Sequence, residues 1–221
     1  MTIDLPDPLS CVVFDLDGTL IDSIGEIAES VNEIRKQRKA QTLPIDTVRT
    51  AVGHGARVLC ERILTDILES DESIDDLFHE FRATYIQIAS DSSRDICWLP
   101  GARDLIQHLQ GKSVPIAILT NKPRSVTDAL LPRLEDGIDW SAILCPEDAG
   151  IPKPDPTGLR LILEKLNCPV EEALLVGDSA VDFATGAAAG VRTVGRRDGY
   201  GVASPPEPDV WVDHLAQLIR N

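Results

Sequence analysis

The 221-residue sequence lacks three features that would assign it to particular classes of protein. Its five cysteines include no C-x-x-C pair, which favours reduced, structural thiols over a disulfide framework. No stretch approaches the ~18 apolar residues of a membrane-spanning helix. The N-terminus "MTIDLPDPLS" has neither a basic start nor an apolar signal segment. These absences predict a cytoplasmic protein with no membrane partner.

Basic residues are also scarce relative to acidic ones. Against 36 Asp and Glu there are 21 Lys and Arg, which gives a formal net charge of -15. This charge argues against a nucleic-acid partner, and it would repel an anionic substrate unless a metal ion or local cations intervene. The hydrophobic content of 43% is nevertheless enough to fill the core of one domain that carries a sizeable insertion.

Short apolar runs alternate with amphipathic stretches after residue 100. This alternation is typical of a parallel sheet with crossover helices, so polar residues that end the runs should gather at the carboxyl edge of the sheet. The runs are "CVVF" near the N-terminus, then "VPIAILT", "WSAILC", "EEALLVGDS" and "VRTVG".

Residues 23–97 differ, because the strand pattern disappears there. Apolar residues recur at helical spacing from Ile24 to Ile34 and from Ile74 to Ile88. We therefore expect an all-helical insertion over 23–97 within a catalytic core formed by 1–22 and 98–221.

Two aspartates, Asp15 and Asp17, follow the run "CVVF" directly. Aspartate is depleted in strands because its charge resists burial, so the exception needs a chemical reason. Alternate side chains of an extended backbone point the same way, which would bring both carboxylates into one small volume. A hard divalent cation such as Mg²⁺ would offset their repulsion, and Gly18 would allow a tight turn around a ligand. The structural alternative is a capping turn.

Two further strand ends carry polar residues. Thr120 and Asn121 close "VPIAILT", where a hydroxyl and an amide can bind phosphate oxygens or cap the helix that follows Pro123. Lys153 stands between two prolines in "IPKPD", and the stiffened backbone fixes where its ammonium points. A cation held near the two aspartates would supply the positive charge that the chain as a whole lacks.

Asp178 follows the apolar run "ALLVG", and Asp182 lies one helical turn further on the same face. Compensation of the helix dipole would explain Asp178 but not the other charged residues at strand ends. An acidic pair in this place suits a metal ion better than a hydrophobic core.

Taken together, these residues resemble the four motifs of the haloacid dehalogenase superfamily of phosphohydrolases, in the same order and at similar intervals. The resemblance implies an α/β fold with a Rossmann-like, three-layer parallel-sheet core, and the helical insertion is similar to the superfamily's C1 cap. The motifs are Asp15-x-Asp17-Gly18-Thr19, Thr120, Lys153-Pro154 and Gly177-Asp178-x-x-x-Asp182.

The resemblance also implies a role for each residue. Asp15 would attack phosphorus and form an aspartyl phosphate, and Asp17 would protonate the leaving group and then activate water. Thr120, Asn121 and Lys153 would hold the phosphoryl oxygens. The residues implied to bind Mg²⁺ are Asp15, Asp17 through its backbone carbonyl, and Asp178, with Asp182 as support.

Within the insertion, "VGHGARVL" at residues 52–59 is similar to the substrate loop of phosphoglycolate phosphatase-like members. Gly53 and Gly55 would shape this loop. His54 and Arg57 would either contact the substrate or cap the start of a helix.

The predicted function is therefore that of a Mg²⁺-dependent phosphatase, a monomer or homodimer, acting on a small phosphorylated metabolite such as phosphoglycolate. An inorganic pyrophosphatase or a sugar-phosphate mutase on the same fold is the alternative, although such mutases usually carry a histidine where this chain has Ile27. An inert phosphate-binding or scaffold protein is the alternative from another class. Activity assays with Mg²⁺ and with EDTA would discriminate the inert protein from an enzyme.

Overall fold

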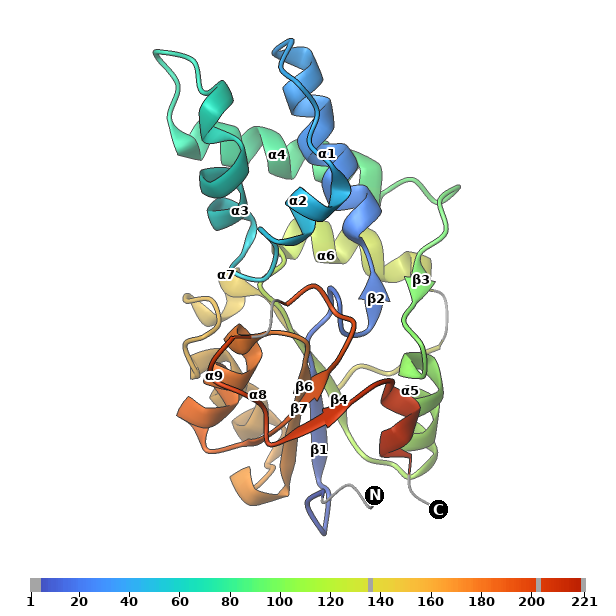
Figure 1. The fold of residues 1–221 in the computed structure, drawn as a ribbon. Coiled ribbons are helices and arrows are strands. Elements are labelled where there is room, and N and C mark those ends of the chain that lie inside the picture. Colours follow the sequence, from blue (N-terminus) through green and yellow to red (C-terminus); the bar gives the residue numbers. More distant parts are fainter. Residues whose placement is uncertain (1–4, 135–136, 202–203, 220–221) are drawn as a thin grey trace.

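The computed structural model describes residues 5–134, 137–201 and 204–219 of the chain. The main sheet of this described part has six parallel strands in the order β5-β4-β1-β6-β7-β8 (Figure 1). The strands are β1 (Cys11–Phe14), β4 (Ile116–Leu119), β5 (Ala142–Leu144), β6 (Ala173–Gly177), β7 (Arg192–Arg196) and β8 (Val210–Val212). All but β8 were predicted; β8 has three residues, too few to show a pattern.

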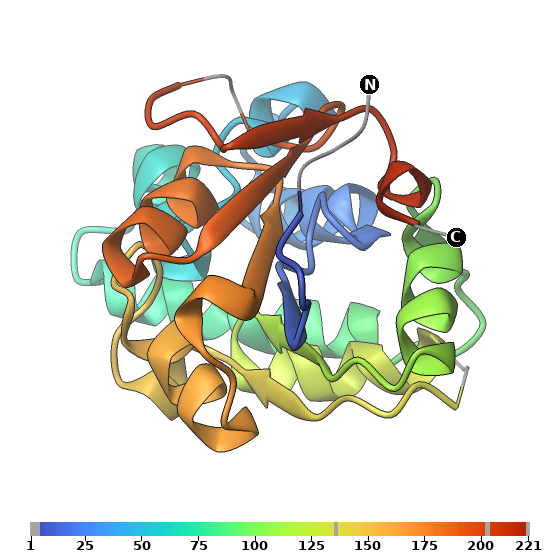
Figure 2. The same ribbon diagram turned by 90° about the horizontal axis from the view of Figure 1, so that it is seen from below.

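Helices cover both faces of the sheet, which explains why every residue of β1 and β4 is buried. Val12 and Phe14 of β1 share one hydrophobic cluster with helices α5 (Ala102–Gly111) and α6 (Arg124–Leu130). Cys11 and Val13 belong to a second cluster with α8 (Thr157–Leu166), beside which α9 (Ala180–Ala189) packs. Figure 2 shows α5 and α9 on opposite sides of the strands. The remaining short helices of the core are α7 (Pro146–Ala149), η2 (Leu131–Leu134), η3 (Val170–Glu172) and η4 (Leu215–Leu218).

This arrangement confirms the predicted α/β class and the Rossmann-like core. The strand order β4-β1-β6 places three of the predicted site segments next to one another, because each follows the carboxyl end of one of these strands.

The predicted helices of residues 23–97 lie beyond the carboxyl edge of the sheet (Figure 1). The chain enters and leaves this helical insertion through β2 (Ile21–Asp22) and β3 (Cys97–Trp98), which pair in antiparallel fashion. None of the helices in the described residues is both long enough and apolar enough to cross a membrane. The helices of the insertion are α1 (Ile24–Gln37), α2 (Ile45–Arg49), α3 (Ala56–Ile63), η1 (Thr65–Ile67) and α4 (Ile74–Ala89).

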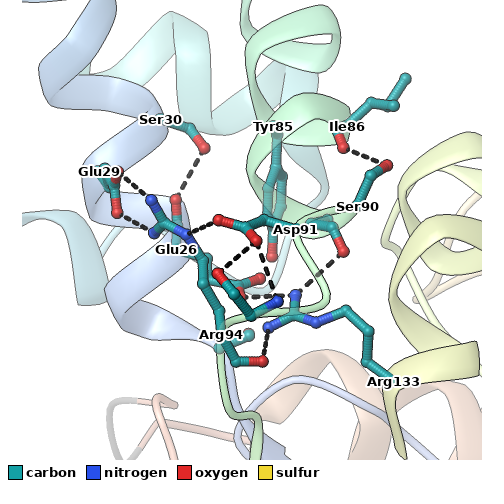
Figure 3. Close-up of polar contacts among 12 residues, drawn as sticks. Glu26, Glu29, Ser30, Tyr85, Ile86, Ser90, Asp91, Arg94 and Arg133 are labelled. Atoms are coloured by element: carbon teal, nitrogen blue, oxygen red, sulfur yellow. Dashed lines mark hydrogen bonds and ion pairs between the residues drawn. The ribbon is translucent and has the colours of Figure 1, made fainter.

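Arg133 of the core, whose side chain is 6% exposed, connects to this insertion (Figure 3). The Arg133 guanidinium pairs with Glu26 Oε1 of α1 at 2.7 Å. It also donates to the carbonyl oxygens of Ala89 at 3.0 Å and Arg94 at 2.7 Å, which lie at and beyond the end of α4. One side chain therefore joins both ends of the insertion to the core.

Candidate active site

The carboxyl edge of the sheet brings together five of the predicted site residues, each from a different turn or loop. Asp15 follows β1, Thr120 follows β4 and Asp178 follows β6, whereas Lys153 comes from the loop after α7 and Asp182 from the first turn of α9. All five are buried. Burying so many charged groups is costly unless they are paired or bind a ligand.

Lys153 is the cation at the centre of this group. Its ammonium lies 2.9 Å from Asp15 Oδ1 and 2.6 Å from Asp182 Oδ1. Burial by itself would lower the pKa of Lys153, but the two carboxylates raise it above its ordinary value. Lys153 is therefore positively charged beside the predicted nucleophile.

Three carboxylates, those of Asp15, Asp178 and Asp182, offer oxygen atoms that all lie within 4.8 Å of one another. Burial, reinforced by the neighbouring carboxylates, raises the pKa of Asp15 to about 8 and that of Asp178 to about 7, and Lys153 partly offsets the effect. Three carboxylates and one ammonium leave two negative charges in the site when all are ionised. A divalent cation would neutralise that charge, and an all-oxygen donor set suits Mg²⁺, so the residues fit this ion.

The two acidic residues after β6 have different surroundings. Asp182 uses Oδ1 for Lys153, while its Oδ2 accepts hydrogen bonds from the backbone N–H and the hydroxyl of Ser179 at 3.1 and 2.7 Å. Asp178 Oδ2 accepts from the backbone N–H groups of Tyr200 and Gly201, and its Oδ1 is 3.5 Å from the Thr19 hydroxyl. Both oxygens of Asp182 are thus occupied by protein donors, whereas Asp178 Oδ1 is the oxygen more available to a metal ion.

A loop that sequence reasoning missed encloses Asp178. A Cβ atom added to Gly199 would lie 2.2 Å from Asp178 Cβ, and one added to Gly201 would lie 2.3 Å from the Asp178 carbonyl oxygen. Only glycine permits this approach. The signal in the sequence was the pair of glycines that flank Tyr200 in "DGYG".

Asp17 does not join the acidic cluster as strand alternation predicted. β1 ends at Phe14, and the chain then turns at Gly18, whose φ is +81°. Alternation therefore stops before Asp17. Its carboxylate instead accepts hydrogen bonds from the Lys122 ammonium, at 2.9 Å to Oδ1 and 3.1 Å to Oδ2, and from the Ser23 hydroxyl at 2.5 Å.

Lys122 is the second site residue that the sequence analysis missed. Its side chain is 1% exposed, and its ammonium also donates to the hydroxyl of Tyr85 on α4 and lies 4.4 Å from the centre of that ring. A buried lysine is rare unless it is paired. The available signal was its place directly after Thr120 and Asn121 at a strand end.

Asn121 also differs from the expectation. Its side-chain amide donates to the carbonyl oxygens of Gly53 at 3.1 Å and Lys153 at 2.9 Å, and it accepts from the Lys153 backbone N–H at 2.8 Å. These contacts fix the Lys153 backbone and the loop at Gly53. They occupy the amide that was expected to bind phosphate.

A small cavity lies between the strand ends and the helical insertion, with about 50 Å³ of space for the centres of water molecules. The core side of the cavity contributes Asp15, Asp17, Thr120, Asn121, Lys122 and Pro123. The insertion contributes Gly53, Gly55, and the mainly apolar side chains of Ile27, Val52, Ala56, Leu59, Phe81 and Tyr85.

Two residues of the predicted substrate loop do not line this cavity. Arg57 pairs with Glu61 and with Asp75, the latter at 2.9 Å, and its side chain is 48% exposed. His54 is likewise outside the lining, and burial followed by the charge of Arg62 lowers its pKa. Of the four residues predicted to form the substrate site of this loop, Gly53 and Gly55 line the cavity, whereas His54 and Arg57 do not.

Known proteins are similar to this chain in sequence. The family model of haloacid dehalogenase-like hydrolases matches residues 9–190. A phosphoglycolate phosphatase of Pseudomonas fluorescens is 32% identical over 212 residues, which cover 94% of this chain and 78% of that protein. A phosphoglycolate phosphatase of Photobacterium profundum is 30% identical over 213 residues, covering 94% of this chain and 93% of that protein.

Solved structures are similar over almost the whole chain. The crystal structure of a predicted phosphoglycolate phosphatase from Haemophilus somnus matches with a TM-score of 0.82 and 26% identity, covering 96% of each chain. The structure of CbbY from Rhodobacter sphaeroides in complex with phosphate has a TM-score of 0.80, with 95% of this chain and 96% of that chain covered. At 21% identity, the latter supports the fold alone.

Proposed function

Because the chain belongs to the haloacid dehalogenase-like hydrolase family, we propose that it is a Mg²⁺-dependent phosphatase. Its substrate is a small phosphate monoester, with phosphoglycolate as the candidate, and the reaction passes through a phosphorylated Asp15. The observation that carries this proposal is the buried carboxylate of Asp15, held 2.9 Å from the Lys153 ammonium beside Asp178.

In the first step, an oxygen of Asp15 attacks phosphorus and the bond from phosphorus to the ester oxygen breaks. Lys153 and Thr120 hold the phosphoryl oxygens, so that an anionic nucleophile can approach an anionic ester. Asp182 and Asn121 act on Lys153, one through its ammonium and the other through its backbone. Mg²⁺, when held by Asp15, Asp178 and the Asp17 carbonyl, supplies further neutralisation of charge.

Asp17 moves the protons. In its protonated form Asp17 gives a proton to the departing ester oxygen, and in the second step the resulting carboxylate takes one from the water that attacks phosphorus, which restores the protonated form. That attack breaks the acyl phosphate bond, restores the Asp15 carboxylate and releases inorganic phosphate. The hydrogen bonds from Lys122 and Ser23 hold the Asp17 carboxylate at the wall of the cavity.

We assign the role of a cap to residues 23–97, with the core formed by 1–22 and 98–221. The antiparallel pair β2 and β3 lies where the chain passes between these parts. A cap that lies over this cavity would select small esters and exclude bulk water. Ile27 lines this cavity, and its aliphatic side chain cannot transfer a proton as the histidine of a mutase would. Cytoplasmic location and a monomeric or homodimeric state stay predictions.

The test is phosphate release from phosphoglycolate by the purified protein, with Mg²⁺ and after exhaustive chelation. We expect activity only with Mg²⁺, and none in the Asp15→Asn variant, because an amide is a poor nucleophile. Asp213→Asn is the matched control, since the side chain of Asp213 is 70% exposed and distant in sequence from the motifs. Full activity after chelation, or in Asp15→Asn, would refute the proposal.

A further inference from the structure

The cavity has an uneven distribution of charge. The insertion contributes apolar side chains and the backbone of Gly53 and Gly55, so it offers no cationic group among the described lining residues. On the core side, Lys122 is the one positively charged residue among those that the structure describes in the lining. Arg57, for which contact with the substrate was one of two expectations, is paired with acidic residues outside the cavity.

Lys122 is placed by contacts that come from both sides of the cavity. Its ammonium contacts Asp17 of the core at 2.9 and 3.1 Å, and it donates to the hydroxyl of Tyr85, which extends from α4 (Figure 3). An ammonium has three donors, and two of these contacts go to one carboxylate. Giving up one Asp17 contact would leave that ion pair intact and free a donor for a ligand.

The ligand must lie close to the ester oxygen, because Lys122 touches the residue that protonates it. In a phosphate ester of a 2-hydroxycarboxylate, the carbon that bears the ester oxygen is bonded directly to the carboxylate carbon. The carboxylate then lies beside the ester oxygen and within reach of an ammonium that contacts Asp17. An ester with its carboxylate further along the chain would place that charge among the apolar side chains of the insertion, at a desolvation cost.

We propose that Lys122 and the Tyr85 hydroxyl form a carboxylate subsite that selects phosphate esters of 2-hydroxycarboxylates, a specificity that rests on the proposed phosphatase function. Phosphoglycolate is the smallest such ester. Lys122 contacts the substrate carboxylate directly, and Tyr85 contributes from the cap, so the subsite is complete only when cap and core are together. Phosphate recognition is left to Lys153 and Thr120.

The experiment compares phosphoglycolate with ethyl phosphate, in which a methyl group replaces the carboxylate. For wild type, Lys122→Met and Lys122→Arg, we would measure kcat/KM for both esters and take their ratio. The wild type should prefer phosphoglycolate. In Lys122→Met the ratio should fall at least tenfold because a charge-assisted hydrogen bond is lost, and Lys122→Arg should restore part of it. Loss of the contact between Lys122 and Asp17 would lower kcat/KM for both esters, and this shared effect cancels in the ratio.

A second measurement needs no variant and therefore does not depend on folding of Lys122→Met. Glycolate and its neutral analogue glycolamide would be compared as inhibitors of p-nitrophenyl phosphate hydrolysis by the wild type. Glycolate should inhibit at concentrations at least tenfold lower. Equal inhibition by the two, or an equal fall of both esters in Lys122→Met, would overturn the subsite.

Failure of the underlying function would look different. In that case the wild type would hydrolyse no ester, p-nitrophenyl phosphate included, in a manner that requires Mg²⁺ and Asp15. A Mg²⁺- and Asp15-dependent enzyme that does not prefer phosphoglycolate to ethyl phosphate would refute the subsite and leave the phosphatase in place.

Discussion

Tyr200 links the acidic cluster to the start of the helical insertion. Its phenol oxygen accepts hydrogen bonds from the backbone N–H groups of Ser23 at 2.7 Å and Ile24 at 2.9 Å, and it donates to Asp22 Oδ1 at 2.5 Å. Its own backbone N–H donates to Asp178. We predict that Tyr200→Phe destabilises the protein at the junction between core and insertion while keeping the aromatic packing.

The magnitude follows from which partners are left without a hydrogen bond. Ile24 N–H keeps Asp22 Oδ1 at 3.3 Å, and Asp22 is exposed, so water can replace the lost phenol there. Ser23 is buried and loses the acceptor of its backbone N–H. One buried, unsatisfied donor costs about 1–3 kcal/mol, which is the expected fall in the free energy of unfolding.

The assay is urea unfolding combined with hydrogen exchange of the Ser23 and Ile24 amides. Tyr85→Phe is the matched control, because Tyr85 is also buried and the two side chains that its hydroxyl contacts, Lys122 and Ser23, both keep Asp17 as a partner. The control should lose about 1 kcal/mol or less. A loss below about 0.5 kcal/mol for Tyr200→Phe, within the range of surface substitutions, together with unchanged exchange, would refute the reasoning.

Three further predictions concern other contacts of the site and of the helical insertion. With p-nitrophenyl phosphate, whose phenolate leaves without a proton, the Asp17→Asn variant should accumulate phosphorylated Asp15, and its turnover should fall about 10²–10⁴-fold. Mass spectrometry after an acid quench would detect the phosphoryl group. Finding that group on the Asp15→Asn variant instead would reverse the two roles. Asp182→Asn should lower kcat/KM about tenfold or more, because Lys153 loses a charged partner at 2.6 Å, and unchanged steady-state kinetics would contradict this. Arg133→Met should lower the free energy of unfolding in urea by about 3–5 kcal/mol, because it leaves Glu26 buried and unpaired. The double variant with Glu26→Gln should recover part of that loss. If the losses of the two single variants simply add in the double variant, this explanation is excluded.

Local patterns in the sequence were sufficient for much of the architecture. Helical spacing of apolar residues predicted α1 and α4, and five apolar runs predicted β1, β4, β5, β6 and β7. Both patterns arise because one face of an element packs against the core, and this gives apolar residues a regular spacing along the chain. Strand ends also predicted the meeting of Asp15, Thr120 and Asp178, because parallel strands share a carboxyl edge.

The tertiary structure decided the partners of individual side chains. Asp17 was expected beside Asp15, yet the turn at Gly18 takes it to Lys122, and Asp182 stands in the acidic cluster in its place. The pairing of β2 with β3 and the loop of Tyr200 around Asp178 were likewise not predicted.

The physical reason is the separation of these partners along the chain. Lys122 and Asp17 are 105 residues apart, and Tyr200 and Asp178 are 22 residues apart. A local pattern reports which face of an element is buried, but not which distant group will satisfy a charge there. The sequence by itself indicated Asp15, Thr120, Lys153, Asp178 and Asp182, whereas the packing of residues 23–97 against the core brought Lys122 and Tyr85 together with Asp17 at the cavity.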